Sequence, residues 1–160
     1  MRVVLTAVGR LKAGPERELC ARYLERAALA ARSVGLTGVE MREFEESRAR
    51  RPEDRKAEEA RSLSQQIPPG ARLVVLDERG KTMGSELFAA DIGKARDSGA
   101  SGYVLVIGGA DGIDPALRDR ASLVLAFGAM TWPHQLVRIM AAEQIYRAVT
   151  ILAGHPYHRS

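Results

Sequence analysis

Short apolar runs alternate along the chain with longer segments in which apolar residues recur every three or four positions. The run RVVLTAV at residues 2–8 is rich in β-branched residues and is followed by a glycine, which predicts a buried strand. The segment at residues 15–33 begins with a proline and places Leu19, Tyr23 and Ala27 at helical spacing. The chain therefore opens with a strand and then a helix.

The same alternation continues to the C-terminal end. Apolar runs predict strands at residues 37–44, 71–80, 102–112 and 122–128, and helical spacing predicts helices at residues 52–67, 84–99, 114–121 and 133–154. Capping residues support several helix ends: Ser85 and Asp114 are candidate N-caps, Pro115 suits a first helical turn, and Gly154 suits a C-terminal cap.

The predicted strands are continuous apolar runs, which is typical of parallel strands covered on both faces. No internal repeat and no linker divides the sequence. We therefore expect a single domain over residues 1–160, of the α/β class, with a parallel sheet between two layers of helices.

Composition and charge narrow the possible functions. The 160 residues are 46% hydrophobic and carry a net charge of +4, which suits one globular domain and permits contacts with nucleic acid without requiring them. The C-terminal end is the electropositive one, because from Trp132 onward Arg138, Arg147 and Arg159 face only Glu143, and all 3 histidines lie there.

Several classes of site and location are disfavoured. No apolar run approaches the roughly 20 residues that span a bilayer, and the N-terminal residues lack the pattern of a secretory signal. The sequence has 1 cysteine, Cys20, and therefore no cysteine pair for a zinc site. It also has no acidic cluster that would suggest a magnesium site. We expect a cytoplasmic protein with no membrane segment and no metal.

Ligands of open α/β sheets bind beyond the carboxyl ends of the strands. Three predicted strand ends stand out: Leu76-Asp77, the pair Gly108-Gly109, and the segment AFGAMTW at residues 126–132. The glycine pair either allows a backbone to approach a ligand or makes a tight turn. It matches neither a dinucleotide fingerprint nor a Walker loop, and the sequence has no Ser-His-Asp or Cys-His order of an acyl transferase.

The segment FGAMTW carries no charged side chain. It is either an ordinary loop that enters the core or a loop whose backbone groups and apolar walls hold a flat heterocycle. Trp132 either is buried or stacks on an extruded base. His134 either caps the last helix or takes part in chemistry, and Glu143 and Arg147, four residues apart, fit an ion pair.

Taken together, the pieces VIGGADG, MTWPHQLVRIMAAEQIYRA and HPYHRS, with VVLDERGK and the opening VVLTAVGRLK, resemble the bacterial ribosomal large-subunit pseudouridine N3-methyltransferases of the SPOUT superfamily. The resemblance covers essentially the whole chain. It implies an α/β/α fold with a deep C-terminal trefoil knot, a homodimer, and S-adenosylmethionine as methyl donor. It also implies methylation at N3 of a pseudouridine in 23S rRNA of the assembled 70S ribosome.

The resemblance further assigns residues. Those implied to bind the cofactor are Leu76, Gly108, Gly109, Phe127, Gly128, Ala129, Met130, Thr131 and Trp132. Those implied to lie near the reacting base are His134, Arg138, Glu143, Tyr157, His158 and Arg159. The terminal YHR would close the partner subunit's pocket in the dimer.

The residues leave the mechanism open. His134 or His158 would take the proton from the imide nitrogen, or Arg138 or Arg159 would stabilise its anion without a base. Tyr157 would stack on the base or form a hydrogen bond with it. Two other functions also remain at this stage: a non-catalytic module that binds the ribosome, and a related methyltransferase that acts on tRNA.

Overall fold

In the computed structural model, which describes residues 1–158, the strands form one parallel sheet in the order β2-β1-β4-β3-β5. The strands are β1 (Arg2–Val8), β2 (Gly38–Phe44), β3 (Arg72–Lys81), β4 (Gly102–Ile107) and β5 (Leu123–Leu125). The helices are α1 (Pro15–Ala31), α2 (Pro52–Ser64), α3 (Ser85–Asp97), α4 (Pro115–Asp119) and α5 (His134–Leu152), with a short 3₁₀ turn at Arg32–Val34. The α/β class and the parallel sheet are confirmed.

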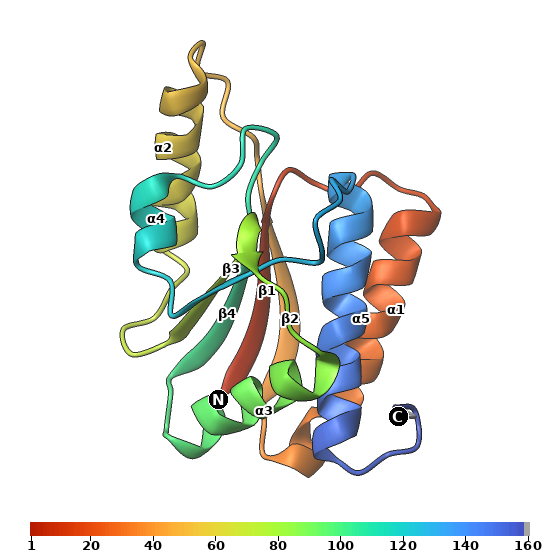
Figure 1. Cartoon of the computed structure of the whole chain (residues 1–160). Helices are drawn as coiled ribbons and strands as arrows, with labels where there is room; N and C mark the ends of the chain where they lie inside the picture. The colour runs from red at the N-terminus through yellow and green to blue at the C-terminus, as the bar shows by residue number, and fades with distance from the viewer. Residues whose placement is uncertain (159–160) are drawn as a thin grey trace.

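The helices cover both faces of the sheet. Helices α1, α3 and α5 lie on one face, and α2 and α4 lie on the other (Figure 1). The strands feed the two cores alternately: in β4, Leu105 packs with the α1, α3 and α5 side, and Val104 and Val106 pack with the α2 and α4 side. Strands β1 and β4 are nearly all apolar because both of their faces are buried. The expectation of continuous apolar strands is wrong for the edge strand β2, which is half-buried and carries Glu40, Arg42 and Glu43.

Most predicted elements are confirmed, with two corrections. The prediction of Ser85 as an N-cap was wrong: Gly84 holds the cap position, and the Ser85 hydroxyl donates to Gln144 Oε1 at 2.7 Å. The last strand is shorter than its apolar run, because the chain leaves the sheet after Leu125. The Asp114 cap is confirmed, since its side chain accepts a hydrogen bond from the Ala116 amide at 2.8 Å.

Strand β3 contacts β5 at two places. Leu76 and Lys81 both pair with Leu125, and the Ala126 amide donates to the Lys81 carbonyl at 3.0 Å. Gly80 passes so close that a Cβ there would lie 2.6 Å from the Leu125 carbonyl carbon. Residues 76–81 therefore pass beside the end of β5; the trefoil knot itself stays a prediction.

Within residues 1–158, every helix is too short or too polar to cross a membrane. In the same residues, no three His, Cys, Asp or Glu side chains gather closely enough to hold a metal ion.

Candidate active site

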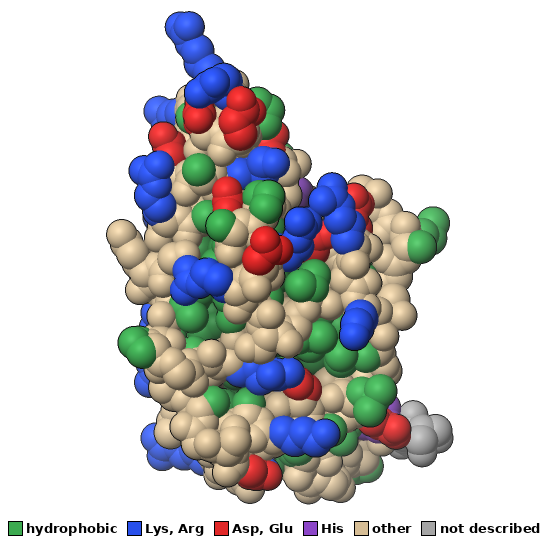
Figure 2. All heavy atoms as spheres, turned by 60° about the vertical axis from the view of Figure 1, so that its left-hand side comes forward, with side chains coloured by type: hydrophobic (Ala, Val, Ile, Leu, Met, Phe, Trp, Pro, Cys, Tyr) green, Lys and Arg blue, Asp and Glu red, His purple; other side chains and the backbone are tan. Residues whose placement is uncertain are grey.

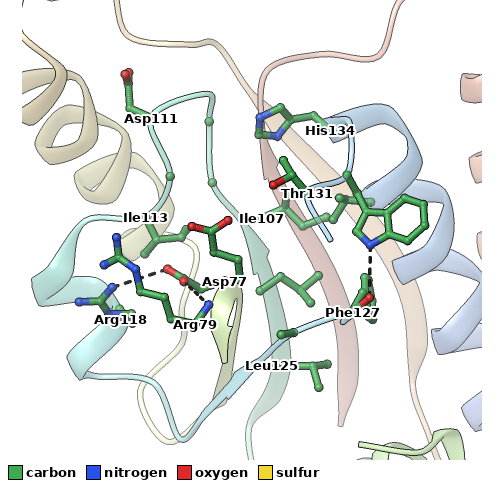
Figure 3. Close-up of a pocket in the computed structure, with 18 of the residues that line it drawn as sticks. Asp77, Arg79, Ile107, Asp111, Ile113, Arg118, Leu125, Phe127, Thr131 and His134 are labelled. Atoms are coloured by element: carbon green, nitrogen blue, oxygen red, sulfur yellow. Dashed lines mark hydrogen bonds and ion pairs between the residues drawn. The ribbon is translucent and has the colours of Figure 1, made fainter. Parts of the chain in front are cut away.

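A cavity of about 360 Å³ lies beyond the carboxyl ends of β3, β4 and β5 (Figure 3). Of the residues predicted to bind a cofactor, all but Ala129 line it: Leu76, Gly108, Gly109, Phe127, Gly128, Met130, Thr131 and Trp132. Parallel strands bring their ends to one edge of a sheet, so residues far apart in sequence meet there. His134, at the start of α5, also lines the cavity.

The loop at residues 127–132 is closed by its own tryptophan. The Trp132 indole N–H donates to the Phe127 carbonyl at 3.2 Å, and Gly128 has a φ of 102°, which side chains other than glycine rarely adopt. The indole is 39% exposed. The alternative of a buried tryptophan is therefore wrong, and Trp132 lines the cavity; stacking on an extruded base stays a prediction.

Gly108 ends β4 in a tight turn. The Gly112 amide donates to the Gly109 carbonyl at 3.0 Å, and a Cβ on Gly108 would lie 2.8 Å from the Gly112 carbonyl oxygen. Real Cβ atoms do not approach so closely, so this position requires glycine. The tight turn is therefore confirmed, and it forms part of the cavity wall; the close approach of a ligand to this backbone stays a prediction.

Charged residues that the motifs did not predict as part of the site line one side of the cavity. Asp77 follows the last buried residue of β3, and Arg118 on α4 approaches its carboxylate at 3.7 Å (Figure 3). Asp77 also accepts a hydrogen bond from the Arg79 amide at 2.9 Å. The signal for Asp77 was its place directly after Leu76, whereas nothing local in the sequence pointed to Arg118.

Helix α2 holds the glycine turn from behind. Arg55 binds Asp111 through two hydrogen bonds of 2.6 and 2.9 Å, and the hydrogen bonds from Arg55 hold the pKa of the Asp111 carboxyl below its usual range. Glu59 is 7% exposed, and burial raises the pKa of its carboxyl although the Ser47 amide donates to it. Neither residue was predicted, because the pairing joins distant segments.

Three of the residues predicted near the base form a second cluster, away from this cavity. The Tyr157 hydroxyl donates to Glu143 Oε1 at 3.1 Å, and Arg147 binds the same oxygen and lies 3.4 Å from His158 Nδ1. The Tyr157 ring packs on Tyr146, with centroids 4.7 Å apart. Burial, followed by hydrogen bonding to Tyr23, raises the pKa of the Tyr157 hydroxyl.

This cluster lies toward the C-terminal end of α5, whereas His134 begins that helix (Figure 1). Glu143, which Tyr157 contacts, lies nine residues after His134, a rise of about 14 Å along the helix, and neither Tyr157 nor His158 lines the cavity of its own chain. Arg159 lies outside the described residues.

Arg138 occupies a third place. It is 3% exposed, donates to Glu43 Oε1 at 2.8 Å and to the Val8 carbonyl at 2.5 Å, and does not line the cavity. Burial lowers the pKa of its guanidinium. In this structure Arg138 joins α5 to the ends of β1 and β2.

Comparison with known proteins shows the family of this chain. A family model described as "Predicted SPOUT methyltransferase" matches residues 1–158. The chain belongs to the SPOUT methyltransferase family. The resemblance stated from the motifs is thereby confirmed at the level of the family, and the cavity at the strand ends is the candidate active site of a methyltransferase.

Relatives match along the full length. A protein of Beijerinckia indica subsp. indica named "Ribosomal RNA large subunit methyltransferase H" is 58% identical over 160 residues, which is 100% of both chains. A protein of the same name from Methylocella silvestris is 59% identical over 159 residues, covering 99% of each chain.

A solved structure of a putative methylase family protein from Neisseria gonorrhoeae is 12% identical, with 91% of this chain and 80% of that chain covered and a TM-score of 0.44. That similarity is too low to bear on the site.

Proposed function

We propose that this chain transfers a methyl group from S-adenosylmethionine to N3 of a pseudouridine in 23S rRNA. Two relatives that match at 58% and 59% identity over nearly their whole length carry the name of a large-subunit rRNA methyltransferase. The assembled 70S ribosome in the cytoplasm is the proposed substrate, because a net charge of +4 supplies little attraction for naked RNA.

One observation carries the proposal: the cavity has an apolar wall and a charged wall built on three strand ends. Leu76, Ile107 and Leu125 suit a flat heterocycle such as adenine. Across from them, the carboxylate of Asp77 and the guanidinium of Arg118, 3.7 Å apart, suit the ammonium and carboxylate of an amino acid. The donor set therefore fits S-adenosylmethionine.

When bound, the cofactor supplies an electrophilic methyl group on its sulfonium, so the chain needs to supply position and a deprotonated nitrogen. The wall at residues 127–132 and the turn at Gly108 define the position. His134 is the one histidine among the described residues that lines the cavity, which makes it the preferred general base in this chain.

A homodimer is part of the proposal, because one chain keeps its tail away from its own cavity. A second cavity lies among α1, α3 and α5, lined by Leu19, Phe88, Ile139, Met140 and Glu143. Leu87 and Leu136, on α3 and α5, are exposed large apolar side chains. Apolar surface of this kind suits a second copy, whose Tyr157 and His158 would then complete the site.

The test compares large-subunit rRNA from cells with and without this gene. We expect mass spectrometry to find one methylated pseudouridine that is lost on deletion and restored by the wild-type gene. The purified protein should also bind S-adenosylmethionine, reported by the fluorescence of its 1 tryptophan, Trp132. The variant Trp132→Phe controls for signals that do not come from the indole. Identical rRNA in both strains would refute the proposed function.

A further inference from the structure

The segment between β2 and α2 presents two arginines to solvent. Residues 45–49 belong to no helix or strand and the chain bends at residues 50–51, with Ser47 and Ala49 half-buried and Arg48 and Arg50 exposed. Arg51 pairs with Asp54 at 2.8 Å, but within residues 1–158 neither Arg48 nor Arg50 has a carboxylate in ion-pair range. Two guanidiniums on one face are therefore free to bind an external anion.

Helix α2 fixes the backbone of this segment. Arg55 Nη1 donates to the carbonyls of Ala49 and Arg50 at 3.1 and 3.0 Å. One turn later, Glu59 Oε1 accepts a hydrogen bond from the Ser47 amide at 3.0 Å. A segment outside the sheet is thus held by three hydrogen bonds with two side chains that lie four residues apart on one helix face.

The same two side chains also hold the glycine turn of the cavity. Arg55 binds both carboxylate oxygens of Asp111, and a Cβ on Gly109 would lie 2.7 Å from Glu59 Oε2, so the turn rests on that carboxylate. Arg55 and Glu59 therefore contact both the arginine segment and the cavity wall. Any group bound by Arg48 and Arg50 is held at a fixed offset from the candidate active site.

We propose that Arg48 and Arg50 form a binding site for backbone phosphates of the RNA substrate, positioned relative to the methyl-transfer cavity by Arg55 and Glu59. The identity of the RNA rests on the proposed function. Figure 2 shows Lys and Arg side chains projecting from the top of the molecule, where α2 begins, with acidic side chains among them. RNA phosphate is the favoured ligand because guanidinium groups bind phosphate oxygens through paired hydrogen bonds.

The test measures the affinity of the protein for purified 70S ribosomes over a range of salt concentrations. The same measurement is made with protein-free 23S rRNA over a lower range of salt concentrations. Each lost phosphate contact reduces the slope of log affinity against log salt by about 1. For Arg48→Ala/Arg50→Ala we expect a slope smaller by about 2 on both probes, and affinity lower by about tenfold or more at low salt. Affinity for S-adenosylmethionine should be unchanged, because neither arginine lines the cavity.

The matched control is Arg61→Ala/Arg120→Ala. These two arginines are also exposed and line a groove between α2 and α4, and the double variant removes the same charge. It should keep the wild-type salt slope. The variant Arg48→Lys/Arg50→Lys should retain most of the slope, and a melting temperature equal to wild type excludes misfolding.

A wild-type slope for the Arg48→Ala/Arg50→Ala variant overturns the proposal. An equal loss in the control shows only general charge attraction and also overturns it. If the wild type binds protein-free rRNA and the variant's effect is seen on ribosomes alone, the contact is with ribosomal protein and the proposal is overturned as well. Binding is read separately from methylation. If the wild type binds RNA through these arginines without methylating it, the proposed function fails while this site stands.

Discussion

At the residue scale, the turn at Gly108 shows how little room the cavity wall leaves. The position a Cβ would occupy is 2.8 Å from both the Gly112 carbonyl oxygen and Ile113 Cδ1. The backbone oxygen belongs to a hydrogen-bonded turn and cannot move without displacing the wall, so packing at this residue sets the shape of the cavity.

We therefore expect Gly108→Ala to weaken binding of S-adenosylmethionine by about tenfold, since overpacking of this kind costs about 1–3 kcal/mol. Isothermal titration calorimetry measures the affinity. The control is Gly102→Ala at the opposite end of β4, where a Cβ would meet neighbours at 3.8 Å. Equal affinity in both variants would show that the turn does not shape the binding site.

The sequence predicted much of this site at the level of single residues. The assignments of Leu76, Gly108 and the loop at residues 127–132 came from strand ends and motifs, and these residues share one cavity. Arg118 was missed, because its approach to Asp77 joins α4 to β3 and leaves no pattern in either segment.

At the scale of elements, α5 does more than the periodicity of its sequence indicated. Its first turn carries His134 to the cavity and its second places Arg138 at the ends of β1 and β2. Glu143, at the middle of the helix, and Arg147, one turn later, contact the tail. Residues assigned together by motif are therefore separated by the rise of one helix.

Arg138→Met should destabilise the protein by about 3–5 kcal/mol, because it leaves the Glu43 carboxylate partly buried without its partner. Urea denaturation measures the change. Arg147→Met, which removes a more exposed pair within α5, should cost about 1 kcal/mol or less. If Arg138→Met instead retained stability and lost only methylation, Arg138 would be a catalytic residue as the motif implied.

At the scale of the whole molecule, the position of the tail matters most. Residues 155–158 lie beside the later part of α5 (Figure 1), where Tyr157 contacts Glu143, and neither Tyr157 nor His158 lines the cavity. In the proposed homodimer, the tail of one copy would lie at the cavity of the other copy.

Two impaired variants should therefore complement each other when S-adenosylmethionine is kept too dilute to fill the weakened Gly108→Ala cavity. Deleting residues 157–160 leaves the cavity intact, and Gly108→Ala leaves the tail intact. Random mixing of refolded subunits should restore about a quarter of wild-type activity, since about half of the dimers pair one intact cavity with one intact tail. Methyl incorporation into 70S ribosomes measures it. Activity no higher than the sum of the separate variants would show that the tail acts within its own chain or not at all.

The sequence by itself determined the order of elements, the parallel sheet and the edge where chemistry gathers. It did so because these properties depend on local apolar runs, caps and the direction of strands. Tertiary structure alone decided three things: the pairing of Asp77 with Arg118, the contacts that Arg55 and Glu59 make with the glycine turn and the arginine segment, and the burial of Arg138. Each depends on contacts between segments distant in the chain, and such contacts exist only once the layers have packed.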